Sequence, residues 1–226
     1  MQTIFHGVGT MRKKTIIVDY ELGNLFSVLQ ACMHVGLDTE VSSDPAKVAS
    51  ADALILPGVG AFGAAMANLR RNGTEAALKA HVVAGKPFLG ICLGMQLLFK
   101  DSMEFGLQGG LSLLPGKVIR IPGEIHGQKA AVPQIGWNQV MPPPHRKWPG
   151  TPLEHLVDGA YMYFVHSYYV VPDHPRDCLA LTDYMGLEYC SAIQKDNILA
   201  FQFHPEKSGH GGVEIYRKWG AMNGML

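Results

Sequence analysis

A cysteine between two glycines is the residue in this sequence best suited to act as a nucleophile. Cys92 follows the short apolar run 88–91 and has Gly90 and Gly94 on either side. A strand, then Gly-x-nucleophile-x-Gly, then a helix is the pattern of a nucleophile elbow, a sharp turn in which glycines remove clashing side chains. The sulfur then lies at the amino end of a helix, where the dipole and free amides favour a thiolate. The next amide, that of Leu93, can point at the oxyanion of a tetrahedral intermediate.

A histidine and a glutamate two residues apart supply the other groups that such chemistry needs. A thiolate needs a neighbouring imidazole to carry protons, and the imidazole needs a carboxylate to fix its tautomer. Pro205 favours an extended conformation at His204, and extended residues two apart point to the same side, about 6.5 Å from each other. Glu206 can therefore reach one ring nitrogen of His204 while the other faces the thiol. His166 is the alternative base, but no carboxylate lies near it in the sequence.

A cysteine, a histidine and a glutamate could also bind a metal, and a cysteine could simply pack in the core. Zinc sites usually contain paired ligands such as CxxC or HxxxH, and neither spacing occurs here. A buried cysteine most often packs as a small hydrophobic residue. We interpret Cys32, Cys178 and Cys190 as packing or surface residues because they lack the glycine-flanked turn. We therefore predict nucleophilic catalysis by Cys92 without a metal or another cofactor.

Short apolar strands that alternate with helices must position these residues. Strands separated by helices imply right-handed crossovers and a parallel sheet, and continuous apolar strands are typical of a sheet covered on both faces. Ligands bind at the carboxyl ends of such strands, where the glycine-rich turn 57–60 and Cys92 both fall. We expect strands at 15–19, 39–42, 52–56 and 88–91, and helices at 25–35, 61–70 and 74–84.

The second half of the chain is richer in proline, aromatic and β-branched residues. Five prolines in 141–152 predict an exposed loop, because proline disrupts both helix interiors and central strands. The predicted fold is a single doubly wound α/β domain, 11–226, with a mainly parallel central sheet, flanking helices and additional strands. Residues 1–10 are expected to be an N-terminal extension. We expect further strands at 118–121, 161–165, 168–171, 191–195 and 198–203, and a last helix near 211–222.

The composition is that of a globular protein with a large core. Hydrophobic residues make up 47% of the chain, and 19 basic residues balance 19 acidic ones. This balance gives no reason to expect nucleic acid or an anionic membrane as the main partner. We expect no membrane span and no signal peptide, because no apolar run is long enough and residues 1–10 lack the order of a signal. Four cysteines without a CxxC pair suggest reduced thiols in a cytoplasm.

Six segments together resemble the class I (triad) glutamine amidotransferases, and more closely the glutaminase subunits of imidazole glycerol phosphate synthase, from histidine biosynthesis. The cysteine and His-Pro-Glu segments mark the broad class, whereas Gly-Trp-Asn and Phe-Val-His-Ser-Tyr point to this subunit. The resemblance runs from about Thr15 to the C-terminus, with a departure at Gln134, a position we associate with histidine in relatives. The segments are 23–25, 57–63, 90–96, 133–138, 163–168 and 202–208.

The resemblance implies a role for each residue of the site. Cys92 would attack the side-chain amide of glutamine, His204 would protonate the departing ammonia and then activate water against the thioester, and Glu206 would orient His204. Gln96, one helical turn beyond Cys92, lies on the same helix face. The family pattern places the oxyanion hole at the amides of Val59 and Leu93, and the substrate-binding residues are Gly58, Gly60, Gln96, Ser167 and Tyr168.

The resemblance also implies a partner. Ammonia is largely protonated in neutral water and then cannot act as a nucleophile, so a glutaminase should pass it directly to a second active site. The family partner is the cyclase subunit of imidazole glycerol phosphate synthase, a (β/α)₈ barrel that forms the heterodimer. Asn24, Trp137 and Lys207 match positions of that interface. Alternatively, Trp137 belongs to the core and Lys207 is a solvated charge.

Two other functions stay open at this point. The chain could be the glutaminase of another class I amidotransferase, for anthranilate or pyridoxal phosphate synthesis. The anthranilate type shares Cys92 and His-Pro-Glu but lacks the Gly-Trp-Asn and Phe-Val-His-Ser-Tyr segments. A catalytically silent binding subunit on the same fold is the third possibility, and the presence of all three triad residue types argues against it.

Overall fold

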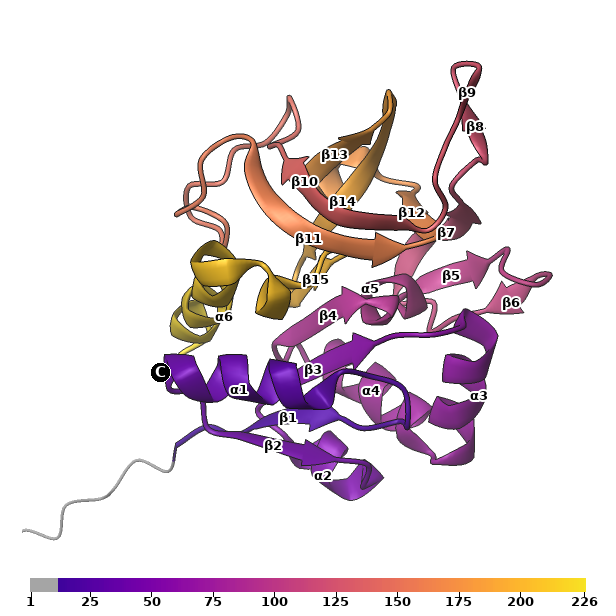
Figure 1. The fold of residues 1–226 in the computed structure, drawn as a ribbon. Coiled ribbons are helices and arrows are strands. Elements are labelled where there is room, and N and C mark those ends of the chain that lie inside the picture. The colour runs from indigo at the N-terminus through magenta and orange to yellow at the C-terminus, as the bar shows by residue number, and fades with distance from the viewer. Residues whose placement is uncertain (1–11) are drawn as a thin grey trace, which may run out of the picture.

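A large mixed sheet organises the computed structural model, which describes residues 12–226 (Figure 1). The expected extension 1–10 lies outside the described residues. The sheet has eleven strands in the order β2-β1-β3-β4-β15-β14-β12-β7-β5-β6, with β13 paired to β14. The predicted α/β architecture with additional strands in the second half is confirmed.

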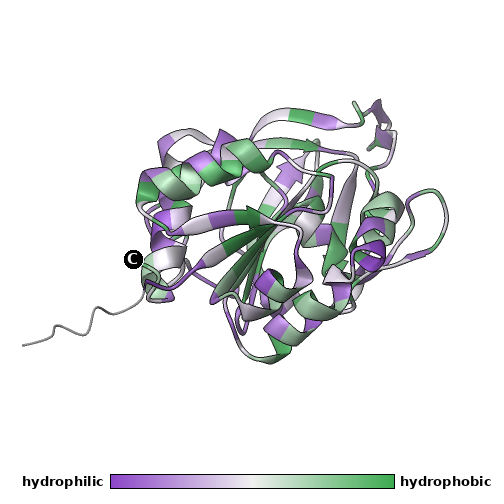
Figure 2. Ribbon diagram, turned by 90° about the horizontal axis from the view of Figure 1, so that it is seen from below, coloured by the Kyte–Doolittle hydropathy of each residue, from purple (hydrophilic) through white to green (hydrophobic). Residues whose placement is uncertain are grey.

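Five neighbouring strands form the parallel half of the sheet. All residues of the four inner strands β1, β3, β4 and β15 are buried, which explains their continuous apolar sequences. Figure 2 shows these strands as the hydrophobic centre of the molecule, enclosed by helices of mixed character. The parallel strands are β1 (Thr15–Val18), β2 (Thr39–Ser42), β3 (Ala53–Gly58), β4 (Phe88–Cys92) and β15 (Ile198–Phe201).

Helices cover both faces of these strands, as in a doubly wound fold (Figure 1). Successive strand residues point to opposite faces, so Ile17 packs in one hydrophobic cluster and Ile16 in another. The first cluster contains residues of α1 and α6, and the second contains residues of α2, α3 and α4. The helices are α1 (Leu25–Val35), α2 (Pro45–Ser50), α3 (Phe62–Arg71), α4 (Thr74–Val83) and α6 (Gly209–Met222), and the short α5 (Leu93–Leu97) follows β4 directly.

The chain from Phe99 onward adds mostly antiparallel strands. Two of them, β10 (Gln134–Val140) and β11 (Ala160–His166), form a separate pair in which Gln134 faces His166 and Trp137 faces Tyr163. A small hairpin joins β8 (Glu124–Ile125) and β9 (Gln128–Lys129). The strands that extend the main sheet are β5 (Phe99–Ser102), β6 (Gln108–Gly109), β7 (Leu114–Arg120), β12 (Tyr168–Pro172), β13 (Cys178–Tyr184) and β14 (Leu187–Lys195), and short 3₁₀ turns lie at η1 (Pro175–Asp177) and η2 (Pro205–Lys207).

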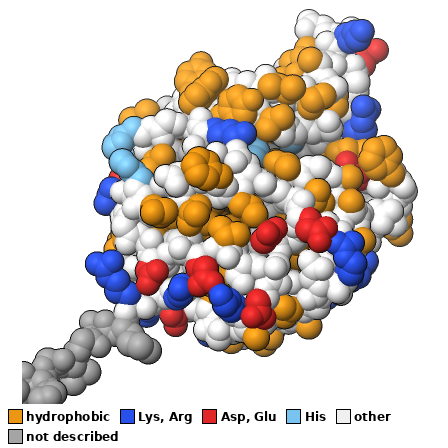
Figure 3. Space-filling model, turned by 60° about the horizontal axis from the view of Figure 1, so that its bottom comes forward, with side chains coloured by type: hydrophobic (Ala, Val, Ile, Leu, Met, Phe, Trp, Pro, Cys, Tyr) orange, Lys and Arg blue, Asp and Glu red, His pale blue; other side chains and the backbone are white. Residues whose placement is uncertain are grey.

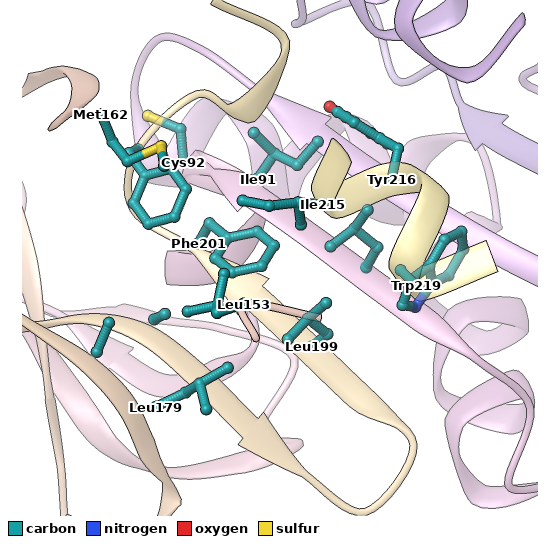
Figure 4. Close-up of a cluster of buried hydrophobic side chains, with 14 of the residues drawn as sticks. Ile91, Cys92, Leu153, Met162, Leu179, Leu199, Phe201, Ile215, Tyr216 and Trp219 are labelled. Atoms are coloured by element: carbon teal, nitrogen blue, oxygen red, sulfur yellow. The ribbon is translucent and has the colours of Figure 1, made fainter. Parts of the chain in front are cut away.

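One buried cluster joins β4, β15 and α6 beneath the edge where β4 ends (Figure 4). Phe201 and Leu199 of β15 belong to this cluster together with Ile91 of β4 and Trp219 of α6. Cys92 stands at the border of this cluster, next to Ile91. The nucleophile candidate therefore projects from well-packed strands rather than from a loose loop.

The proline-rich segment 141–152 is irregular, as predicted, but it is not wholly exposed. Trp148 is buried, and its Nε1–H donates to the Leu179 carbonyl at 2.9 Å. Arg146 donates to the side chain and the carbonyl of Gln194. Prolines exclude regular structure here, whereas the indole and the guanidinium anchor the segment, a role that a proline count does not indicate.

Acidic and basic side chains lie next to one another along the lower part of the face shown in Figure 3, and hydrophobic side chains gather above them. This pattern agrees with the equal numbers of acidic and basic residues. Within 12–226, the helices are too short or too polar to span a membrane.

Candidate active site

Cys92 lies in the strained turn that the glycine pattern predicted. It is the last residue of β4, with φ 54° and ψ −109°, and α5 begins at the next residue. A positive φ is uncommon for a residue other than glycine and occurs often at functional sites. A Cβ at Gly94 would lie 1.8 Å from the Leu56 carbonyl oxygen, and one at Gly90 would lie 3.2 Å from the Gly94 carbonyl oxygen. A side chain at position 94 would therefore collide with the backbone of β3, and one at position 90 would be tightly packed against the turn.

His204 and Glu206 form a buried pair close to the carboxyl end of β15. The Nδ1 of His204 lies 2.8 Å from Oε1 of Glu206, and the two side chains are 3% and 1% exposed. His204 itself is extended, with φ −102° and ψ 96°, but η2 begins at Pro205. The strand expected over 198–203 ends at Phe201. The carboxylate thus reaches the imidazole through a tight 3₁₀ turn rather than through a continued strand.

Strand order brings this pair to Cys92. β15 and β4 are parallel neighbours, and Phe201 pairs with Ile91, so His204 and Cys92 both follow the same edge of the sheet. The backbone N–H of His204 donates to the Tyr163 carbonyl at 2.9 Å, which fixes the histidine against β11. The three predicted catalytic residues therefore converge from two distant segments of the chain.

Electrostatics within the site favour a charged imidazole. Burial lowers the pKa of His204, but the thiolate of Cys92 and the carboxylate of Glu206 outweigh burial and raise the pKa to about 10. The Nε2 of His204 is buried and has no hydrogen-bond partner among the described residues. This nitrogen is therefore free to exchange a proton with a reacting group near the sulfur.

A cavity of about 230 Å³ opens beside Cys92. Six residues that we predicted for the oxyanion hole and for substrate binding line it: Val59, Gly60, Leu93, Gln96, Ser167 and Tyr168. Glu104, Pro133, Val165 and His166 complete the lining together with Cys92.

Gly58 stands behind this cavity rather than in its wall. It pairs with Cys92 across the parallel ladder, and a Cβ there would lie 2.0 Å from the Tyr20 hydroxyl. That hydroxyl donates to the Pro57 carbonyl at 2.8 Å. Tyr20 therefore holds the start of the loop that leads through Val59 to Gly60.

Two polar residues of the site were missed by the sequence analysis. Glu104 brings a carboxylate to the cavity from the turn between β5 and β6, and it accepts from the Phe62 amide. A single glutamate in a region without a recognised strand carries no signal. Gln202 is fully buried, and its Nε2 lies 3.7 Å from the sulfur of Cys92. Gln202 lies two residues before His204, and its position directly after β15 was the available signal.

His166, the alternative base, lies in the cavity wall with both ring nitrogens engaged. Its Nδ1 is 2.9 Å from the Tyr168 carbonyl oxygen, and its Nε2 is 3.1 Å from the Tyr189 hydroxyl. Burial, together with the charge of His204, lowers the pKa of His166 to about 4. Its environment therefore favours a neutral structural role over proton transfer.

Two of the three predicted interface residues meet on the surface. Trp137 is 55% exposed, and its ring packs edge-on against Tyr163 at a centroid distance of 6.2 Å. The Nζ of Lys207 lies 5.9 Å from the centroid of the same tyrosine. Trp137 is therefore not part of the core. Asn24, the third predicted interface residue, lies at the N-terminus of α1, where its side chain accepts from the Ser27 amide at 3.4 Å.

Within 12–226, no group of three or more His, Cys, Asp or Glu side chains is arranged to hold a metal ion. The four cysteines are buried free thiols.

Comparisons with known proteins are consistent along nearly the whole chain. A family model for class-I glutamine amidotransferases matches residues 16–219, and the domain limits 11–226 stay a prediction. Imidazole glycerol phosphate synthase subunit HisH of Syntrophotalea carbinolica is 46% identical over 209 residues, which cover 92% of this chain and 99% of that protein. The same subunit of Symbiobacterium thermophilum is 47% identical over 210 residues, with 92% and 94% covered. A crystal structure of a glutamine amidotransferase shares the fold with a TM-score of 0.70 at 17% identity, covering 93% of this chain and 98% of that one.

Proposed function

This chain belongs to the class-I glutamine amidotransferase family, among the glutaminase subunits of imidazole glycerol phosphate synthase, and we propose that Cys92, His204 and Glu206 carry out its reaction. The observation that supports this assignment most strongly is the buried His204–Glu206 pair. The second ring nitrogen of His204 has no hydrogen-bond partner within 12–226, and Cys92 lies close enough to raise the pKa of this histidine. Such an arrangement is that of an activated nucleophile with an oriented base.

The imidazole is protonated when the reaction begins, because the pKa of His204 is raised to about 10, and we propose that the sulfur beside it reacts as the thiolate. The sulfur of Cys92 attacks the side-chain amide carbon of glutamine and forms a tetrahedral intermediate. His204 gives its Nε2 proton to the amide nitrogen and the C–N bond breaks. Ammonia departs, and Cys92 remains bound to the substrate as a thioester. Neutral His204 then takes a proton from water, which attacks the thioester and releases glutamate and the thiolate.

Backbone amides next to the nucleophile would stabilise the oxyanion in both steps. The Leu93 amide is at the first position of α5, where backbone N–H groups have no partner within the helix. The Val59 amide would supply the second donor from the loop held by Tyr20. Removal of one such donor typically costs about 10²–10³ in kcat.

The polar lining of the cavity suits the amino-acid end of glutamine. Glu104 supplies a negative charge to the lining, which complements an α-ammonium group. Gln96 and the backbone near Ser167 add neutral hydrogen-bonding groups. A carboxylate and the sulfur in the lining of one cavity suit a substrate that carries both an ammonium group and an amide, as glutamine does.

Ammonia release from glutamine tests the catalytic assignment. The Cys92→Ala variant is expected to lose all measurable turnover, because it removes the atom that forms the thioester. Cys32→Ala, which changes a buried cysteine of α1 outside the cavity, is the matched control and should keep its activity. Normal turnover by Cys92→Ala would refute the mechanism.

We also propose that the chain docks on a (β/α)₈-barrel cyclase to form a heterodimer, which places ammonia release next to a second active site. The exposed cluster of Trp137, Tyr163 and Lys207 supports this, because aromatic residues flanked by polar groups are typical of protein contacts. The cluster adjoins the site, since Lys207 follows Glu206 in η2. Co-purification with the cyclase, rather than with an anthranilate or pyridoxal phosphate synthase, is the expected result.

A further inference from the structure

The side chain of Gln202 fills the space between the sulfur of Cys92 and the amide of Gln96. Gln202 is fully buried, directly after β15, and its backbone N–H donates to the Ser191 carbonyl at 2.9 Å. The backbone is therefore fixed to β14, and the side chain reaches into the site from a rigid position. Neither the triad nor the set of predicted substrate-binding residues includes it.

Only one assignment of nitrogen and oxygen in the side-chain amides of Gln96 and Gln202 satisfies the hydrogen bonds around them. The Tyr168 carbonyl oxygen can only accept, so the Gln96 atom 2.9 Å from it must be the amide nitrogen. The same nitrogen lies 3.0 Å from Gln202, which must then present its oxygen. The other end of the Gln202 amide, its nitrogen, is left facing the sulfur of Cys92 at 3.7 Å. The order follows from donor and acceptor chemistry and leaves no freedom to exchange nitrogen and oxygen in either amide.

We propose that Gln202 is a further active-site residue that donates an N–H to the sulfur of Cys92 and, through its oxygen, fixes Gln96 for substrate binding. This inference rests on the proposed glutaminase function of the site. It assigns Gln202 two tasks at once, one directed at the nucleophile and one at the substrate.

The contact of Gln202 with the sulfur complements the proton transfer proposed for His204. A hydrogen bond to the charged form of an acid favours that form, so an amide N–H favours the thiolate. His204 changes its protonation during the reaction, whereas an amide keeps its hydrogens. Gln202 therefore offers the sulfur a donor that persists through acylation and hydrolysis, both when the thiolate attacks and when it leaves.

The contact with Gln96 decides what the cavity presents to the substrate. Both hydrogens of the Gln96 amide are engaged, one by the Tyr168 carbonyl and one by Gln202. Gln96 lines the cavity, and its carbonyl oxygen is the polar atom left to face a ligand. An acceptor in this position suits the α-ammonium of glutamine. Without Gln202, the amide of Gln96 could rotate and present a donor instead.

Two substitutions separate the tasks. Gln202→Glu keeps an oxygen for Gln96 but replaces the N–H that faces sulfur, whereas Gln202→Met removes both contacts with little change in shape. We measure the pH profile of Cys92 alkylation by iodoacetamide, which needs no oxyanion hole, and the KM and kcat for glutamine. Both variants should shift the alkylation profile to higher pH, by about half a unit or more. KM should rise about five-fold or more in Gln202→Met and stay within about two-fold in Gln202→Glu.

The control is Gln194→Met, which removes a glutamine amide of β14 that accepts from Arg146 and does not line the cavity. It should leave both readouts unchanged. Gln96→Met should raise KM without moving the alkylation profile, and combining it with Gln202→Met should add little to KM, because the two residues act through one contact. If either folded Gln202 variant shows a wild-type alkylation profile, or Gln202→Met a wild-type KM, the inference is wrong. The proposed function fails separately, through an active Cys92→Ala.

Discussion

At the scale of single residues, the site is built around a proton that stays on His204 far into the alkaline range. The Cys92 thiolate and Glu206 raise the pKa of this histidine to about 10 despite its burial. The ordinary pKa of histidine is about 6.5, so the folded protein binds this proton more tightly than the unfolded chain does. Because the pKa of His204 differs between the folded and unfolded states, this histidine makes a contribution to the free energy of unfolding that depends on pH.

This contribution can be measured through Glu206→Gln. A raised pKa stabilises the fold fully below the unfolded value of about 6.5, and the contribution disappears as pH rises through about 10. The stability advantage of the wild type over Glu206→Gln should therefore shrink between these two pH values, as urea unfolding at a series of pH values would show. The control Glu214→Gln, which breaks an exposed pair with Arg217, should show no such trend. An advantage that does not change with pH would contradict the electrostatic account.

Glu104 provides a test of substrate binding at the same scale. Glu104→Gln removes the negative charge from the cavity lining, so we expect KM for glutamine to rise about ten-fold while kcat changes little. Steady-state kinetics give both constants. Glu154→Gln, which removes a carboxylate paired with Lys218 on the surface, should leave KM unchanged. An unchanged KM in Glu104→Gln would place the α-ammonium elsewhere.

Local sequence was sufficient to find some of these residues and insufficient for others. Cys92 and His204 could be predicted because their function requires particular neighbours, namely flanking glycines and a carboxylate two residues on. Glu104 and Gln202 depend on contacts with residues that are distant in sequence. Nothing next to them in the chain distinguishes them from ordinary polar residues.

At the scale of elements, the loop after β3 depends on a single hydroxyl. Tyr20 lies in the connection between β1 and α1, is fully buried, and donates to the Pro57 carbonyl at 2.8 Å. The absence of a side chain at Gly58 lets the tyrosine approach. The peptide that leads to Val59 is thereby tied to a second strand connection.

We expect Tyr20→Phe to lower kcat about ten-fold or more with little change in KM. The loop 57–60, which carries the Val59 amide, loses its hydrogen bond from Tyr20, whereas the residues that bind the substrate are unchanged. The unpaired Pro57 carbonyl should also cost about 1–3 kcal/mol of stability. Thr151→Val removes another buried hydroxyl, one that donates to the Trp148 carbonyl outside the cavity, and should cost stability alone. Equal losses of kcat in both variants would show that Tyr20 acts through stability and not through the loop.

Elements were predictable where burial alone determines the sequence. The inner parallel strands are apolar on both faces and were found within one or two residues. β10 was missed because five of its seven residues are not buried and Gly136 adopts a positive φ, so the run lacks the pattern of a core strand. β5 was missed because its sequence, Phe-Lys-Asp-Ser, has a polar centre and continues directly from α5. Both segments form strands because they pair with neighbouring strands, which their own residue types do not indicate.

At the scale of the whole molecule, the exposed cluster of Trp137, Tyr163 and Lys207 lies next to the turn that carries Glu206. A tryptophan that is 55% exposed has apolar area available to bury against a partner. Tryptophan is among the residues that most often dominate binding energy at interfaces. The cluster is therefore the place to test the proposed heterodimer.

Trp137→Ala should leave the basal glutaminase rate of the isolated chain unchanged and weaken binding of the cyclase about thirty-fold, or about 2 kcal/mol. Titration of the cyclase, in the presence of its nucleotide substrate, against ammonia release measures both. Met222→Ala, which truncates a half-exposed side chain in the last turn of α6, should bind like the wild type. Wild-type affinity in Trp137→Ala would move the interface elsewhere.

The 3₁₀ turn at η2 has a consequence for how docking and chemistry share the molecule. Glu206 points inward to the imidazole, while the adjacent Lys207 is exposed and lies over the partly buried ring of Tyr163. A partner protein that contacts Lys207 would contact the residue next to Glu206, whose carboxylate orients His204. Binding of a subunit at Lys207 could then affect the His204–Glu206 pair directly, without a series of contacts across the fold, because Lys207 and Glu206 are consecutive residues.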